Sequence, residues 1–186
     1  MSADTLARRR GTTTHLSPLL MKARRLGLDT PTELERLAIQ RGCEYYDTQP
    51  GDSVLRDEAP LPVSRMAFSN GELAVALLCL YPPVSLLRRR MGACVLSASD
   101  VEVREVAALA QSEQCADLVR YIADCGHRIE PDVAFWKSLQ LALAGVTYDA
   151  NTMPHPTRFI EMTGINRGST AIQKRWVRPV AALALA

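Results

Sequence analysis

Residues 69–145 decide the fold, and they read SNGELAVALLCLYPPVSLLRRRMGACVLSASDVEVREVAALAQSEQCADLVRYIADCGHRIEPDVAFWKSLQLALAG. Apolar side chains recur there at intervals of three or four residues, as in Leu73, Leu77 and Leu80. That period is typical of amphipathic helices, in which such residues line one face. Pro82-Pro83 interrupts the first run, because proline cannot continue a helix. The stretch therefore predicts several short helices rather than a few long ones.

The chain carries a repeated signal for the start of a helix. In a capping box, serine or threonine is followed three residues later by glutamate, and each side chain bonds the backbone N–H of the other residue. Three places show this spacing: Thr30 with Glu33, Ser69 with Glu72, and Ser99 with Glu102. We expect one helix to begin at each of them.

Breaks in the apolar pattern predict where the later helices end. The helix that starts at Ser99 is expected to stop at Ser112, and the following one before Gly126, since glycine commonly terminates helices. The last helix is expected to start after Pro131-Asp132 and to end at Gly145.

The region before Ser69 divides into two short helices and a connection. Ser17-Pro18 is expected to open a first helix that Gly27 ends, and the Thr30 helix is expected to stop at Gly42. Residues 43–68 lose the helical pattern. They form either a linker or a loop that packs over the core, and the sequence leaves both interpretations open.

After Gly145 the pattern changes from helical to extended. Residues 158–163 and 171–178 are expected to be two strands of a β-hairpin that turns at Ile165–Gly168. The predicted fold is therefore mainly α: a small bundle of short antiparallel helices with a C-terminal β-hairpin appendage. We divide the chain into a basic arm with a short helix, a helix with a long loop, the helical core, and a proline-rich connection with the basic hairpin: 1–28, 29–68, 69–145 and 146–186.

Charge is distributed unevenly along the chain, although the net charge is only +2. Residues 1–28 hold six basic side chains and one acid, and residues 151–186 hold five and one. Residues 29–150 hold 11 basic and 18 acidic side chains. Such ends can bind a polyanion, or they can fold back onto the acidic centre, and both interpretations remain open.

The five cysteines favour a reducing, cytoplasmic compartment, because they are odd in number and form no CxxC pair. No apolar run reaches the length of about 20 residues that a membrane span needs. We expect no membrane association. The arginine-rich, acid-poor start also overlaps with organellar transit peptides, so import is an alternative.

No enzymatic signature such as a phosphate loop, GxSxG or HExxH occurs in the sequence. Asp124, Cys125 and His127 lie close together and can in principle form a nucleophile–base pair or bind a metal. The structural alternative is a buried cysteine at a helix end, followed by a histidine that interacts with the last carbonyls and the helix dipole. The structural alternative is favoured, and we expect no catalytic residue, metal, cofactor or small-molecule substrate.

Nucleic-acid contacts are expected at the two ends of the chain. Cations beside an aromatic ring suit RNA, since rings stack on bases and charges meet phosphates. The candidate residues are Arg8, Arg9, Arg10, Arg158, Arg167, Lys174, Arg175, Trp176 and Arg178. A DNA-reading helix-turn-helix over Val103–Ile122 is disfavoured, because its second helix is acidic.

The sequence thus predicts a non-catalytic interaction or adaptor protein. Its helical core binds a protein partner or itself, and its basic termini contact nucleic acid, with RNA preferred. One alternative is a structural or assembly subunit with no nucleic-acid role. A second alternative is an enzyme that uses the region around Asp124, Cys125 and His127.

Overall fold

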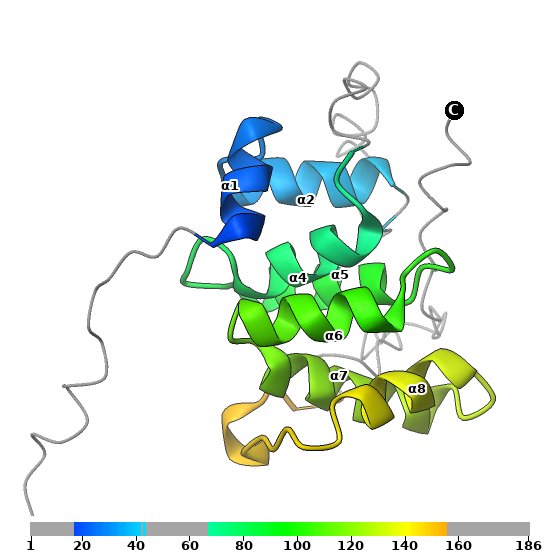
Figure 1. Cartoon of the computed structure of the whole chain (residues 1–186). Coiled ribbons are helices and arrows are strands. Elements are labelled where there is room, and N and C mark those ends of the chain that lie inside the picture. Colours follow the sequence, from blue (N-terminus) through cyan, green and yellow to red (C-terminus); the bar gives the residue numbers. More distant parts are fainter. Residues whose placement is uncertain (1–16, 42, 44–66, 156–186) are drawn as a thin grey trace, which may run out of the picture.

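A computed structural model of the chain describes residues 17–41, 43 and 67–155 (Figure 1). These residues form seven α-helices and one short 3-10 helix, and none of them is in a strand. The elements are α1 (Pro18–Arg25), α2 (Pro31–Gln40), α4 (Asn70–Cys79), α5 (Leu86–Leu96), α6 (Val103–Ser112), α7 (Ala116–Ile129), α8 (Ala134–Ala142) and η4 (Ala150–Thr152). The prediction of a mainly helical protein is confirmed. The predicted β-hairpin and most of the 43–68 connection lie outside the described residues.

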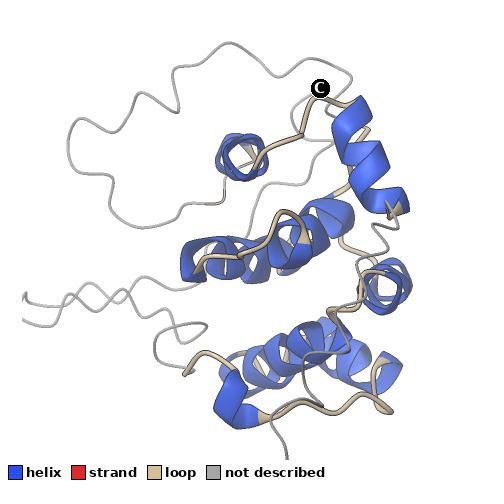
Figure 2. Ribbon diagram, turned by 90° about the vertical axis from the view of Figure 1, so that its left-hand side faces the viewer, coloured by secondary structure: helices blue, strands red, loops and turns tan. Residues whose placement is uncertain are grey.

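The helices are stacked in layers around α4 and α5, as the two perpendicular views show (Figure 1, Figure 2). On one side α1 and α2 pack on α4, and α2 also reaches α5. On the other side α6 packs on α4, and α7 and α8 follow beyond it. The core of the protein is therefore the middle layer, and each outer layer covers one side of it.

Helix α4 is buried along nearly its whole surface. Its sequence, NGELAVALLC, has one charged residue, Glu72, and no polar face. Leu73 to Leu78 are all buried, as are Asn70 and Gly71. A helix that is apolar all round must be enclosed by other elements, and the layers on both sides supply that enclosure. This complete burial differs from the one-sided face that the spacing of its leucines predicts.

The capping box at the start of α4 forms as predicted. The Ser69 hydroxyl accepts a hydrogen bond from the backbone N–H of Glu72 at 3.0 Å. In return the Glu72 carboxylate accepts the backbone N–H of Ser69 at 2.8 Å, and it also pairs with Lys22 of α1. This cap thus fixes the start of α4 and attaches an outer helix to it.

A buried arginine joins three parts of the fold at the same end of α4. Arg41 follows α2 and is 2% exposed. Its guanidinium donates to the Asn70 side-chain oxygen at 2.8 Å and to the carbonyl of Phe68. Asn70 in turn donates to Asp100, between α5 and α6, at 2.9 Å. Burial lowers the pKa of Arg41, while the nearby Asp100 carboxylate opposes this shift.

A second buried arginine closes the other end of α4. Arg88 on α5 is 2% exposed, and its guanidinium donates to the carbonyls of Leu80 and Tyr81. Those carbonyls lie just beyond the last turn of α4, where backbone acceptors lack partners within the helix. Burial lowers the pKa of Arg88, and the Glu35 carboxylate on α2 opposes that shift.

Two of the predicted helix starts lie near the expected positions. Thr30 accepts the backbone N–H of Glu33 at 3.2 Å, and α2 follows. Ser17 accepts the N–H of Leu20 at 3.1 Å and begins α1. The predicted end of α6 at Ser112 is also confirmed.

The predicted capping box of Ser99 and Glu102 is wrong. Helix α6 begins at Val103, and Glu102 is itself the N-cap residue, without a side-chain capping bond. The residues before it form a turn in which Val101 N–H bonds the carbonyl of Ala98. Asp100 in this turn is bonded to Asn70, so a long-range contact replaces the local start signal.

The predicted end of a helix before Gly126 is also wrong. Helix α7 continues through Gly126 to Ile129. A methyl group at Gly126 would lie 2.5–2.7 Å from ring atoms of Trp136, which comes from α8 and is 0% exposed. Glycine is needed here because the indole ring packs directly on the α7 backbone, and it does not stop the helix.

Substituting this glycine should therefore destabilise the protein. We expect Gly126→Ala to lower the free energy of unfolding by about 1–3 kcal/mol, since the buried Trp136 ring has to shift. Chemical denaturation followed by circular dichroism measures this change. Gly145→Ala is the matched control, because nothing lies within 4 Å of the added methyl group. Equal effects of the two substitutions would contradict the close packing of α7 against α8.

Candidate functional site

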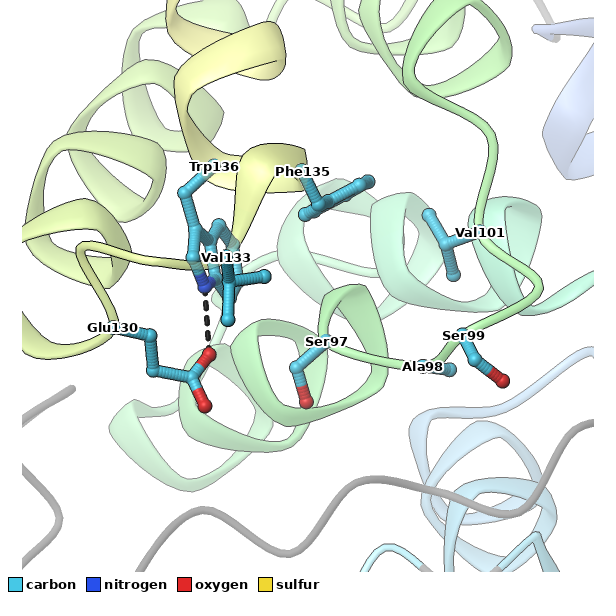
Figure 3. Close-up of a pocket in the computed structure, with 8 residues that line it drawn as sticks. All are labelled: Ser97, Ala98, Ser99, Val101, Glu130, Val133, Phe135 and Trp136. Atoms are coloured by element: carbon cyan, nitrogen blue, oxygen red, sulfur yellow. Dashed lines mark hydrogen bonds between the residues drawn. The ribbon is translucent and has the colours of Figure 1, made fainter.

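A small pocket lies between the end of α5 and the start of α8 (Figure 3). Its volume is about 210 Å³. Ligand pockets commonly measure about 300–1,000 Å³, so this one has room for a single side chain or a group of similar size. Ser97, Ala98, Ser99 and Val101 line it from the connection between α5 and α6, Glu130 and Val133 from the connection between α7 and α8, and Phe135 and Trp136 from the first turn of α8.

The indole of Trp136 forms the fixed wall of this pocket. Its Nε1 donates to the Glu130 carboxylate at 2.8 Å, as drawn in Figure 3. Its ring meets that of Phe135 edge to face, with centroids 5.1 Å apart, and Gly126 lies against it. One oxygen of Glu130 is held by the indole, so the position of this carboxylate at the pocket is set by the fold.

Charge is divided between the two sides of the described body. Residues 97–155, which include α6, α7 and α8, hold nine acidic and four basic side chains. The described residues up to 96 hold eight basic and four acidic side chains. The pocket lies where the acidic part begins. The single count over residues 29–150, with 11 basic and 18 acidic side chains, hides this division.

Asp124 belongs to a network that fastens α8 to α7. Its Oδ1 accepts hydrogen bonds from Arg120 at 3.0 Å and from Gln140 of α8 at 2.8 Å. Its Oδ2 accepts the hydroxyl of Tyr148 at 2.8 Å. Arg120 also donates to the carbonyls of Gln140 and Leu143 at the end of α8. Three donors thus engage this carboxylate in structural contacts.

Cys125 and His127 do not form a pair with Asp124. They are two residues apart inside α7, and side chains at that spacing point to different faces of a helix. Cys125 is buried, burial raises the pKa of its thiol, and Arg128 donates to its sulfur at 3.1 Å. His127 is half-buried, and its Nδ1 is buried without a hydrogen-bond partner. The expected burial of Cys125 is confirmed and His127 lies in the last turn of α7, but the helix does not end at Cys125, because it continues to Ile129.

Four of the five cysteines lie together as two pairs, which their sequence spacing did not indicate. The Cys43 thiol donates to the carbonyl of Met91 at 3.9 Å, and the neighbouring thiol of Cys94 on α5, together with burial, raises its pKa. The Cys79 thiol, at the end of α4, donates to the carbonyl of Val75 at 3.0 Å, and the neighbouring thiol of Cys115, together with burial, raises its pKa. All five cysteines are free thiols. A thiol with a raised pKa is a weak nucleophile, so these pairs favour packing over catalysis.

The nine residues expected to contact nucleic acid all lie outside the described residues: Arg8, Arg9, Arg10, Arg158, Arg167, Lys174, Arg175, Trp176 and Arg178. Within residues 17–41, 43 and 67–155, no group of three or more His, Cys, Asp or Glu side chains comes together to hold a metal ion. No helix in the same residues is both long enough and apolar enough to span a bilayer.

Five large apolar side chains are exposed in the described part of the chain, and they lie on four different helices: Met21, Leu86, Leu87, Ile129 and Leu141.

Comparisons with protein-family models, with curated proteins and with solved structures find no match to this chain.

Two tyrosines attach the segment after α8 to α7. The Tyr148 hydroxyl donates to Asp124, and the Tyr121 hydroxyl donates to the carbonyl of Pro154. Their rings meet edge to face with centroids 5.3 Å apart. Burial, with the hydrogen bond to Asp124, raises the pKa of Tyr148 to about 12, and burial also raises the pKa of Tyr121.

Stability should therefore fall in strongly alkaline solution. A phenol with a raised pKa keeps its proton longer in the folded state, so its stabilising contribution is full below about pH 10, the unfolded value, and is lost as the pH rises toward about 12. Urea unfolding between pH 8 and 12 measures this loss. Tyr148→Phe should reduce the pH dependence above pH 10, and an unchanged slope in that variant would contradict the assignment.

Proposed function

We propose that this protein is a non-catalytic interaction protein whose helical body binds a protein partner and whose basic ends contact nucleic acid, RNA in preference to DNA. The size and position of the pocket between α5 and α8 are the main support for binding of a protein partner. A cavity of about 210 Å³ fits one anchoring side chain. Pockets that receive a buried anchor from a partner dominate the energetics of protein interfaces.

The contacts of the candidate catalytic residues support a non-catalytic role. A general base needs a free acceptor near its substrate, whereas Asp124 accepts three hydrogen bonds from the protein itself. A nucleophilic cysteine needs a lowered thiol pKa, whereas burial raises the pKa of Cys125. Both residues have a structural explanation that requires no substrate.

The nucleic-acid part of the proposal is supported by charge. Residues 1–28 and 151–186 hold eleven basic and two acidic side chains between them. The segment 97–155 has the opposite balance and would repel phosphates. Contacts with RNA are therefore assigned to the ends of the chain, and contacts with protein to the body.

Co-purification from the native host tests the role in protein binding. We expect the tagged full-length chain to retain a protein partner after nuclease treatment, because the body, and not RNA, holds that partner. Phe135→Ala, which removes one wall of the pocket, should reduce the amount retained severalfold. Leu141→Ala is the control, since Leu141 is 68% exposed on the same helix. Loss of every partner on nuclease treatment would contradict the proposal.

Salt dependence tests the RNA contacts. Affinity for a single-stranded RNA should fall steeply with salt, by about 0.7 in log K per tenfold change in salt for each phosphate neutralised. Fluorescence anisotropy of a labelled oligonucleotide measures it. The slope should decrease when these five cations are replaced by glutamine: Arg158, Arg167, Lys174, Arg175 and Arg178. Replacement of the exposed Arg104 on α6 should leave it unchanged, and a flat salt response of the unaltered chain would contradict RNA binding.

A further inference from the structure

We propose that the pocket between α5 and α8 binds the cationic side chain, lysine or arginine, of a basic segment in a protein partner. This inference rests on the function proposed above and adds the chemistry of the partner. Three independent properties of the pocket favour a cation: its charged lining residue, the helix ends that meet there, and its aromatic wall.

The electrostatics of the lining favour positive charge. Glu130 is the one charged residue among the eight that line the pocket. Helices α5 and α7 both end there, at Leu96 and Ile129, and a helix C-terminus carries a partial negative charge. The N-terminus of α8 lies beside them and opposes this effect in part. The negative charge of the two helix C-termini and of the Glu130 carboxylate together exceeds the partial positive charge of the one helix N-terminus.

The aromatic wall suits the same occupant. A guanidinium or ammonium group is attracted to the face of an aromatic ring, and the partly exposed ring of Phe135 lines the pocket beside the buried Trp136 (Figure 3). The Ser97 hydroxyl donates to the carbonyl of Cys94 at 2.7 Å. Its oxygen keeps lone pairs for accepting a hydrogen bond from the cation.

The surroundings indicate the kind of molecule that carries the cation. The pocket opens beside the acidic segment 97–155, which attracts basic polypeptide and repels nucleic acid. Its volume limits what enters to one side chain. Ser99 at its edge is exposed, so the pocket reaches the surface without rearrangement of the helices. A basic protein segment that inserts one side chain satisfies all of these conditions.

Titration with a minimal probe tests this inference on the full-length protein. N-acetylarginine amide is compared with N-acetylcitrulline amide, which has the same shape but no charge. Two-dimensional NMR follows the indole N–H of Trp136, which is distinguished from that of Trp176 by a Trp176→Phe variant. We expect the arginine probe to shift the Trp136 signal with a dissociation constant on the order of 1 mM, and the citrulline probe to bind about tenfold more weakly.

A matched pair of variants assigns the effect to Glu130. Glu130→Gln removes the charge but keeps an oxygen that accepts the hydrogen bond from Trp136, and it should weaken binding of the arginine probe about tenfold. Asp132→Asn removes the same charge from an exposed residue of the same connection that does not line the pocket, and it should leave binding unchanged.

Each outcome decides the inference. Equal binding of the two probes, equal effects of the two variants, or no shift of the Trp136 signal would overturn it. A dimer that Glu130→Gln dissociates would identify the occupant as a second copy of this chain and would also overturn it. A partner that co-purifies although the arginine probe does not bind would leave the proposed function standing. The absence of any co-purifying partner would remove that function, whatever the probe does.

Discussion

The fold depends on the complete enclosure of one helix. Every residue of α4 from Leu73 to Leu78 is buried, so the layers on both sides exist to cover it. Apolar burial stabilises this arrangement but is non-directional, and it would tolerate sliding of the helices. Arg41 and Arg88 make directional hydrogen bonds at the two ends of α4, and a shift of α4 would leave their buried guanidinium groups without acceptors. The two arginines thus fix the position of a helix that apolar contacts alone would hold loosely.

Local signals in the sequence predict most of the helices. They do not predict a helix start or end that contacts between distant residues determine. Ser69 and Glu72 are three residues apart and bond each other, so their pattern could be recognised. The start of α6 could not be recognised in this way. Val101, the residue before its N-cap Glu102, lies in a turn that the hydrogen bond between Asp100 and Asn70, 30 residues earlier, holds in place. Gly126 looks like a helix stop in the sequence, because the sequence does not show that an indole ring packs on it.

The candidate site illustrates the same limit. The pocket joins Ser97–Val101 to Glu130–Trp136, and no spacing rule connects these segments. The thiol pairs of Cys43 with Cys94 and Cys79 with Cys115 are equally long-range. Asp124, Cys125 and His127 are neighbours in the sequence, yet all three lie within the continuous helix α7, which turns the side chains of Cys125 and His127 to different faces. Closeness in the sequence is therefore a poor guide to a site in this protein. The residues that surround the pocket are far apart in the sequence, and only the folded structure brings them together.

The enclosed helix also has a consequence for biosynthesis. Helices α1 and α2 precede α4 in the chain, whereas α6, α7 and α8 follow it. A ribosome must add roughly thirty residues after α4 before α6, the helix that packs on its other side, is complete, and this takes about 2–7 s at usual rates. During that interval one side of a helix with no polar face is open to water. The nascent chain therefore exposes an apolar surface that the folded protein covers, and this interval is when the chain is most prone to aggregate.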